Sequence, residues 1–314
     1  LLAGLIHAWG YQRLQTLDVE ETATIDIGVV QGNISQDRKW KVNRLQWTTQ
    51  HYVDLSRSLV ATSSTPPDLI IFPETALPYY FDEPFYKPYR QPIEQLAQDL
   101  QIPLLVGSLQ GRLGGGKPVY NRAFLLDTQG QISGYADKVH LVPFGEFLPF
   151  PSIFQYLEGL TAESGQFTHG VAHRTIKLPL KNAEMGVFIC YESIFPEITR
   201  ELVQQGANFL VNTTNDAWFG HTAAPHQHFA MAVVRAVETG RAVVRAANTG
   251  ISGVIAPNGR IEYASELFAT TTFIHPVPLR RAQTFYTRYG DLLLVACALL
   301  LAAHALHRRR ARAA

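Results

Sequence analysis

The chain has 314 residues, of which 46% are hydrophobic and 17% are charged, a balance typical of a globular protein with an apolar excess. Its formal net charge of +1 conceals an uneven distribution, because four arginines lie in the C-terminal tail at 308–314. Without that tail, 23 Lys and Arg oppose 26 Asp and Glu, so the charge of the globular part excludes a nucleic-acid binder. Two cysteines, Cys190 and Cys297, cannot form a disulfide framework.

The N-terminal segment 1–14 is mostly apolar from Leu1 to Trp9 and does not begin with Met. We expect it to be the end of a preceding membrane helix that belongs to a longer parent protein. The alternative is an amphipathic N-terminal helix.

Strand-like and helical patterns alternate over the first half of the chain. Apolar runs bounded by turn residues predict strands at 24–30, 68–72, 103–109, 120–127 and 131–137. Helical patterns lie between them at 40–60 and 84–100. Glu74 closely follows the strand at 68–72, and Lys138 follows the strand at 131–137. The carboxyl ends of strands are where α/β folds carry their chemistry.

An aromatic and proline-rich segment follows Lys138, from Pro143 to Pro151. It is too apolar for an ordinary solvated loop, which indicates a lid or a membrane-facing surface. The pair Trp218-Phe219 is a second such group. Together they can exclude water from a reactive intermediate.

Cys190 stands at the end of an apolar run, 186–189, and Pro196 can start the following helix. At such a strand-to-helix turn, free backbone N–H groups and the positive end of a helix dipole favour thiolate over thiol. Cys190 is therefore a candidate nucleophile. The alternative is a small buried hydrophobe, as most unpaired cysteines are.

The second half of the chain continues the alternation. Helices are predicted at 196–205 and 226–239, and strands at 208–213, 242–247 and 252–256. The sequence Pro257-Asn258-Gly259-Arg260 predicts a hairpin. The pattern as a whole indicates the α/β class, with at least one mixed sheet.

The C-terminal segment changes the expected location of the protein. Residues 292–306 form an apolar stretch broken only by His304, and the arginine tail follows it. We expect a transmembrane helix at 286–307 rather than a buried C-terminal helix, and a basic cytoplasmic tail at 308–314. The positive-inside rule then places the globular domain on the outer side of the membrane.

Three groups at strand ends, Glu74, Lys138 and Cys190, make a set that amide and acyl chemistry requires. A carboxylate takes the thiol proton, a cation lies near the developing oxyanion, and sulfur attacks. A metal site is not expected, because the histidines show no HExxH motif and no cysteine-paired zinc spacing. His221, His226 and His228 lie close in sequence without such spacing. No cofactor is expected either.

The motifs around these residues resemble those of the nitrilase, or carbon-nitrogen hydrolase, superfamily, and within it the apolipoprotein N-acyltransferase family of the bacterial inner membrane. They are Phe72-Pro73-Glu74, the segment from Asp137 to Glu146, and Ile189-Cys190-Tyr191-Glu192. Further matches favour the acyltransferases over soluble amidases: Gln31-Gly32-Asn33-Ile34 with Lys39-Trp40, Phe144 to Pro149, Asn215 to Phe219, and the terminal hydrophobic helix. The resemblance covers roughly residues 24–306.

This resemblance implies a four-layer α-β-β-α sandwich at 24–282, held on the periplasmic side of the inner membrane of a multi-pass parent protein. It implies that Glu74 deprotonates Cys190, which attacks an acyl ester of a phospholipid, usually phosphatidylethanolamine. Lys138 and backbone N–H groups hold the oxyanion. The amine of a lipoprotein's diacylglyceryl-cysteine then takes the acyl chain from the thioester.

The resemblance also implies supporting residues, each with a structural alternative. Glu146 is expected to position the amine or Lys138, or to structure its loop. Tyr191 and Glu192 match residues beside the family's cysteine, or shape the turn. Trp40 and Trp218 are expected acyl-chain or lid contacts, or core residues. Asn121 resembles a further site residue.

Two other functions compete with acyl transfer. A membrane-tethered amidase or nitrilase would use water as acceptor and release free fatty acid or ammonia. A catalytically silent lipoprotein-binding module would need no nucleophile, and the presence of Glu74, Lys138 and Cys190 together argues against it.

Overall fold

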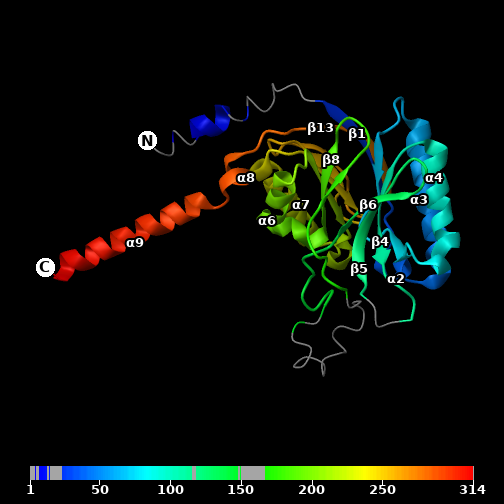
Figure 1. Ribbon diagram of the computed structural model, residues 1–314, viewed down its shortest axis with the longest axis horizontal. Helices are drawn as coiled ribbons and strands as arrows, with labels where there is room; N and C mark the ends of the chain where they lie inside the picture. Colours follow the sequence, from blue (N-terminus) through cyan, green and yellow to red (C-terminus); the bar gives the residue numbers. More distant parts are fainter. Residues whose placement is uncertain are drawn as a thin grey trace.

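The computed structural model of the protein describes residues 23–114, 118–147 and 167–313, together with 149 and, near the N-terminus, 4, 7–12 and 14. Two β-sheets lie at its centre, and helices cover their outer faces (Figure 1).

The first sheet has the strand order β13-β1-β2-β4-β5-β6, and β3 pairs with β4 outside this path. Neighbouring strands β1, β2 and β4 are parallel, whereas β13, β5 and β6 pair antiparallel with their neighbours. The sheet is therefore mixed, as the sequence pattern predicts. Its strands are β1 (Thr24–Gln31), β2 (Leu69–Ile71), β3 (Leu77–Tyr80), β4 (Leu104–Gln110), β5 (Tyr120–Leu126), β6 (Ile132–Asp137) and β13 (Thr271–Pro278).

The second sheet has the order β12-β11-β10-β9-β8-β7, with β8, β9 and β10 parallel. Strands β11 and β12 pair antiparallel across residues 257–260, which confirms the predicted hairpin. Its strands are β7 (Thr175–Lys177), β8 (Glu184–Ile189), β9 (Phe209–Thr214), β10 (Val243–Ala247), β11 (Gly253–Ile255) and β12 (Ile261–Ala264).

Three apolar clusters hold the layers together. Alternate residues of each strand face opposite sides, so Leu69 and Ile71 of β2 lie in the core between the sheets, while Ile70 faces the helices. Helices α3 (Leu45–Thr62) and α4 (Lys87–Leu100) pack on the first sheet. Helices α6 (Pro196–Gln204) and α7 (Ala224–Thr239) pack on the second. The predicted four-layer α-β-β-α sandwich is confirmed (Figure 1).

Short helices occupy several connections. They are α2 (Gln36–Lys39), η1 (Val42–Arg44), η2 (Pro84–Tyr86), η4 (Cys190–Ile194), η5 (Asp216–Phe219) and α8 (Phe285–Tyr289). The helix predicted at 40–60 therefore begins only at Leu45, after α2 and η1.

Strand β13 is an element that the sequence pattern does not predict. Its two prolines, Pro276 and Pro278, weaken the strand signal, because proline cannot donate to a ladder. The strand tolerates them at the edge of the first sheet, where, among the described strands, it pairs with β1 alone.

Helix α9 (Leu292–Ala313) extends away from the sandwich (Figure 1). None of the side chains described in its segment Leu292–Arg310 is buried. Among the described residues, α9 is the one helix long and apolar enough to cross a membrane. The predicted boundary at 286 falls within α8, and Gly290, with φ +62°, separates α8 from α9. Of the predicted N-terminal segment 1–14, residues 4, 7–12 and 14 are helical, and the others lie outside the described residues.

Candidate active site

Glu74 lies just beyond β2, where the chain turns sharply. Thr75 has φ +44°, and a Cβ at Gly107 would lie 2.0 Å from the Pro73 carbonyl oxygen, so only glycine fits beside this turn. The Glu74 carboxylate is buried, and its Oε1 accepts hydrogen bonds from Asn121 Nδ2 at 2.7 Å and from Lys138 Nζ at 3.1 Å. Two predicted site residues thus contact Glu74 directly.

Lys138 lies directly after β6 and is buried between two carboxylates. Its Nζ is 2.6 Å from Glu146 Oε1 in addition to its contact with Glu74. Burial opposes the ammonium charge, but Glu74, Cys190 and Glu146 outweigh burial and raise the pKa of Lys138 well above its ordinary value. Burial also raises the pKa of Glu146, against the attraction of Lys138. Lys138 therefore stays charged.

Cys190 begins η4 with φ +53°, a left-handed conformation that costs a non-glycine residue about 1–2 kcal/mol. Although part of the residue surface stays accessible, burial of the sulfur and the charge of Glu74 outweigh Lys138 and raise the pKa of Cys190 to about 12. The predicted preference for thiolate at this turn is therefore wrong. The resting site holds a thiol, and its deprotonation needs a base.

Glu192 ties the two sheets' strand ends together. Its Oε1 accepts from the backbone N–H groups of Val139 at 2.7 Å and His140 at 3.0 Å, and its Oε2 accepts from Ile189 N at 2.6 Å. It is fully buried. The carboxylate thus fixes the turn after Lys138 against the strand that carries Cys190.

A group of possible metal ligands surrounds the same carboxylate. Atoms of His140, His173 and Glu192 lie within 4.8 Å of one another. His173 Nε2 is 3.1 Å from Glu192 Oε1, and that oxygen also accepts the two backbone N–H groups described above. This oxygen is therefore saturated by donors of the protein itself, which makes it a poor metal ligand.

The other predicted side chains lie around the site with different exposure. Trp40 is 43% exposed and Trp218 is 57% exposed, so the alternative of core packing is wrong for both. Tyr191 packs edge-to-face against Phe195, with ring centroids 5.4 Å apart. In the predicted apolar loop 143–151, the structure describes 143–147 and 149, and Phe144 is 52% exposed.

The sequence analysis assigns no role to two further groups of functional interest. Lys39 is fully buried, and its Nζ donates to the Glu74 carbonyl oxygen at 3.1 Å. Burial lowers its pKa from 10.5 to about 8, against the attraction of Glu74 and Cys190. Behind Cys190, the buried residues Asp216, His228 and Arg245 form a network. No local sequence pattern marks a lysine or arginine as buried.

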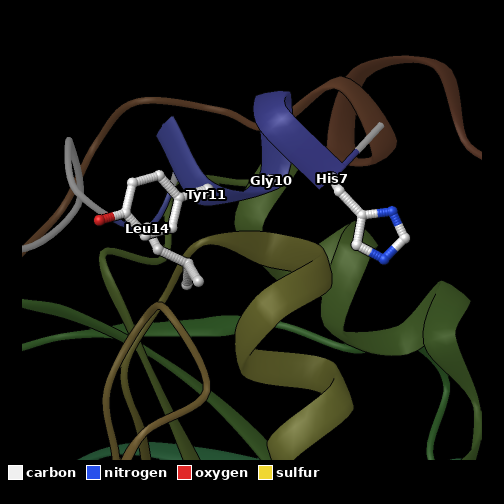
Figure 2. A pocket seen from close by; sticks show the side chains of 4 residues that line it. All are labelled: His7, Gly10, Tyr11 and Leu14. Atoms are coloured by element: carbon white, nitrogen blue, oxygen red, sulfur yellow. The ribbon is translucent and has the colours of Figure 1, made fainter. Parts of the chain in front are cut away.

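A shallow pocket lies on the N-terminal segment (Figure 2). His7, Gly10, Tyr11 and Leu14 line it. None of the candidate site residues does, so this pocket is separate from the site around Glu74, Lys138 and Cys190.

The family model of carbon-nitrogen hydrolases matches residues 26–286 of this chain, from β1 to α8. The chain belongs to the carbon-nitrogen hydrolase family. That range includes strands of both sheets and the candidate site around Glu74, Lys138 and Cys190.

Individual relatives extend this result. An apolipoprotein N-acyltransferase of Geobacter metallireducens is 40% identical over 292 residues, which cover 92% of this chain and 54% of the relative. One of Agrobacterium fabrum is 39% identical over 271 residues, 83% of this chain and 50% of the relative. The chain thus spans about half the length of the curated relatives that it matches.

A solved structure supports the fold. It is a mutant of the amidase from Nesterenkonia sp. AN1 with the acetamide moiety of fluoroacetamide added covalently at its active-site cysteine. The TM-score is 0.61 at 18% sequence identity, and the match covers 88% of this chain and 98% of the amidase.

Proposed function

We propose that this chain is the catalytic part of an apolipoprotein N-acyltransferase. It would move a fatty acyl chain from a phospholipid, in the first place phosphatidylethanolamine, through a Cys190 thioester to the N-terminal amine of a diacylglyceryl-cysteine lipoprotein. One observation carries the proposal. A buried Glu74–Lys138 pair interacts electrostatically with Cys190 in a chain that is 40% identical, over 92% of its length, to a protein of that name.

In the first half-reaction Glu74 takes the Cys190 proton as sulfur attacks the ester carbonyl carbon. A base is needed because the pKa of Cys190 is raised to about 12. Lys138 and backbone N–H groups stabilise the oxyanion. The C–O bond to the glycerol then breaks, Glu74 returns the proton to the leaving oxygen, and lysophospholipid departs. The acyl chain remains on sulfur.

In the second half-reaction the lipoprotein amine attacks the thioester carbonyl carbon. Glu74 accepts a proton from the amine nitrogen, the C–S bond breaks, and the proton returns to sulfur. The products are the N-acylated lipoprotein and the free thiol. Side chains alone supply every proton transfer and charge in this sequence, so the proposed chemistry uses no cofactor.

The supporting residues receive roles from their contacts. Glu146 accepts a hydrogen bond from Lys138, and Asn121 donates to the Glu74 carboxylate, so each fixes one member of the charged pair. Glu192 fixes the backbone at Val139 and Ile189. Tyr191 shapes the turn beside the nucleophile through its contact with Phe195.

Exposed apolar groups favour a lipid substrate. Trp40, Trp218 and Phe144 are each more than 40% exposed, and we assign these three aromatic side chains to contact with the membrane or the acyl chain. Helix α9 would anchor the sandwich in the bacterial inner membrane, with the arginine tail in the cytoplasm and the sandwich on the periplasmic side. The thioester would then form in water-poor surroundings, where hydrolysis is slow.

The molecule that accepts the acyl chain, a lipoprotein amine or water, distinguishes this proposal from a membrane-anchored hydrolase. The full chain in detergent micelles is incubated with phosphatidylethanolamine and a diacylglyceryl-cysteine peptide, and lipids and peptides are measured by mass spectrometry. We expect N-acylated peptide and lysophospholipid in equal amounts. Free fatty acid without acylated peptide would indicate a hydrolase that uses water. Peptide binding without either product would indicate a silent binding module.

Cys190→Ala serves as the control. It should abolish product formation and leave the near-ultraviolet circular dichroism of the folded chain unchanged. Wild-type turnover by this variant would overturn the assigned nucleophile.

A further inference from the structure

The carbonyl of the candidate nucleophile has an unusual partner. His228 Nε2 lies 3.0 Å from the Cys190 carbonyl oxygen. Because a carbonyl oxygen only accepts, Nε2 carries the proton and donates it. His228 belongs to α7, on the outer side of the second sheet, and its side chain is buried.

The imidazole of His228 is held in one orientation from behind. Its Nδ1 lies 2.9 Å from Asp216 Oδ1 and 2.9 Å from Arg245 Nη2, so it has a partner whether or not it carries a proton. Arg245 is fully buried and also donates to Asp216 Oδ2 at 2.8 Å. A Cβ at Gly250 would lie 2.1 Å from that same oxygen, so the backbone closes tightly around the network. Both ends of the ring are therefore fixed.

The hydrogen bond from His228 sets the direction of the peptide group that follows Cys190. In a planar trans peptide, the C=O of one residue and the N–H of the next point in opposite directions, and the described chain contains no cis peptide bond. The Cys190 carbonyl points to α7, whereas its side chain packs against the core between the sheets. The Tyr191 N–H thus points away from α7, toward the side that holds the sulfur.

Within the part of the chain that the structure describes, the Tyr191 N–H has no backbone acceptor outside η4, so it is free for a ligand. Tyr191 is the second residue of η4, and the first N–H groups of a helix have no acceptor within the helix. The left-handed φ of +53° at Cys190 turns the backbone sharply just before this N–H.

We propose that His228 is a positioning residue for the oxyanion of the acyl-transfer reaction. By holding the Cys190 carbonyl, it aims the Tyr191 N–H at the carbonyl oxygen of the bound ester, and Asp216 and Arg245 hold His228. This inference rests on the proposed function, since it takes Cys190 as the nucleophile. His228 does not touch the substrate and takes no proton from the thiol.

Two reactions of the same sulfur separate this role from a structural one. Acylation by p-nitrophenyl butyrate passes through an oxyanion, whereas alkylation by iodoacetamide does not. In the full chain, His228→Leu should slow the p-nitrophenolate burst about 10- to 100-fold, the usual effect of losing a positioning partner. The rate of Cys190 alkylation should stay at the wild-type value, and so should the ester concentration that gives half of the maximal burst rate.

Three further results complete the test. His228→Gln keeps an N–H near the Nε2 position and should restore most of the burst rate. His226→Leu, at an exposed position of the same helix, should match wild type in both reactions. A wild-type burst in His228→Leu, or a parallel loss of acylation and alkylation, would overturn the positioning role while the proposed function stands. Absence of a burst in the wild-type chain would overturn both.

Discussion

The candidate site lies between the strand ends of two sheets, and the side chains on each sheet are held by different kinds of contact. On the first sheet, side chains bind side chains: Lys138 lies between Glu74 and Glu146, and Asn121 binds Glu74. On the second sheet, buried side chains bind backbone: His228 donates to the Cys190 carbonyl, and Glu192 accepts from the Ile189 N–H.

This difference indicates a division of labour. The first sheet supplies the charges that the reaction requires, because Glu74 and Lys138 at its strand ends act on the pKa of Cys190. The second sheet fixes the backbone around the nucleophile, because Glu192 and His228 hold the left-handed turn at Cys190. Substitutions on the first sheet should therefore change protonation and charge, and those on the second should change rates that depend on orientation.

The largest effect is expected for Lys138→Met. It removes the cation between two buried carboxylates, and breaking a buried pair from one side costs about 3–5 kcal/mol. Acyl transfer should fall more than about 100-fold, because the oxyanion loses its cation. Urea denaturation and the product assay measure both effects.

The matched control is Lys181→Met. Lys181 pairs with Asp68 at 2.6 Å, but its side chain is 41% exposed, so the loss should stay below about 1 kcal/mol. Equal losses in the two variants would contradict the importance assigned to the buried pair.

Asp216→Asn should have the next largest effect, about 2–4 kcal/mol, because Arg245 loses its counter-charge. Burial opposes the charge of Asp216, but Arg245 and His228 hold its pKa well below the ordinary value of 3.8. A carboxyl with a lowered pKa stabilises the fold above its unfolded pKa, and this contribution is lost as the pH falls through the folded pKa. The wild-type advantage should therefore shrink below about pH 4.

Denaturation curves at pH 7 and pH 3 test this pH dependence. Asp82→Asn, at an exposed position, is the control and should show a small effect at both values. A difference between wild type and Asp216→Asn that is the same at pH 7 and pH 3 would contradict the assigned ion pair.

Lys39→Met should stabilise the protein, by about 1–3 kcal/mol at pH 7. The pKa of Lys39 is lowered from 10.5 to about 8, so folding at pH 7 must place a charge where burial disfavours it. This penalty is complete below the folded pKa and disappears as the pH rises from about 8 to above 10.5. The same variant should slow Cys190 alkylation, because a cation that favours the thiolate is lost.

The gain in stability should thus be present at pH 7 and absent near pH 10.5. Lys41→Met, at an exposed position two residues away, should show neither effect. Destabilisation of Lys39→Met at pH 7 would show that the hydrogen bond to Glu74 outweighs the burial of the charge.

The smallest change in stability is expected when residues 291–314 are removed. None of the side chains described in the apolar segment Leu292–Arg310 is buried against the sandwich, so the unfolding free energy of the sandwich should change by less than about 0.5 kcal/mol. Sedimentation with phospholipid vesicles should fall strongly. Unchanged sedimentation would contradict the membrane role of α9.

The sequence predicts the catalytic residues on the first sheet better than the supporting network on the second sheet. Glu74, Lys138 and Cys190 each follow a predicted strand closely, and the ends of strands are where α/β folds carry their chemistry. Asn121 and Glu146 are predicted from family resemblance, and both contact the Glu74–Lys138 pair. The layers are predictable because the period of the apolar residues fixes which faces are buried.

The network behind Cys190 could not be predicted in the same way. Arg245 sits inside the strand pattern of β10, where a charge argues against burial, and its partners Asp216 and His228 lie on other elements. Lys39 stands beside the exposed Trp40, which gives no sign that its own side chain is buried. In both cases burial depends on partners brought together by the fold, and local sequence does not encode such contacts.

The most direct test of the account is the covalent intermediate itself. The full chain is incubated with phosphatidylethanolamine alone, and intact-mass measurement with peptide mapping follows. We expect one acyl chain on Cys190 that disappears on addition of a diacylglyceryl-cysteine peptide, and almost no adduct in Glu74→Gln. An acyl chain on another residue, or no adduct in a folded wild-type chain, would contradict the proposed acyl transfer through Cys190.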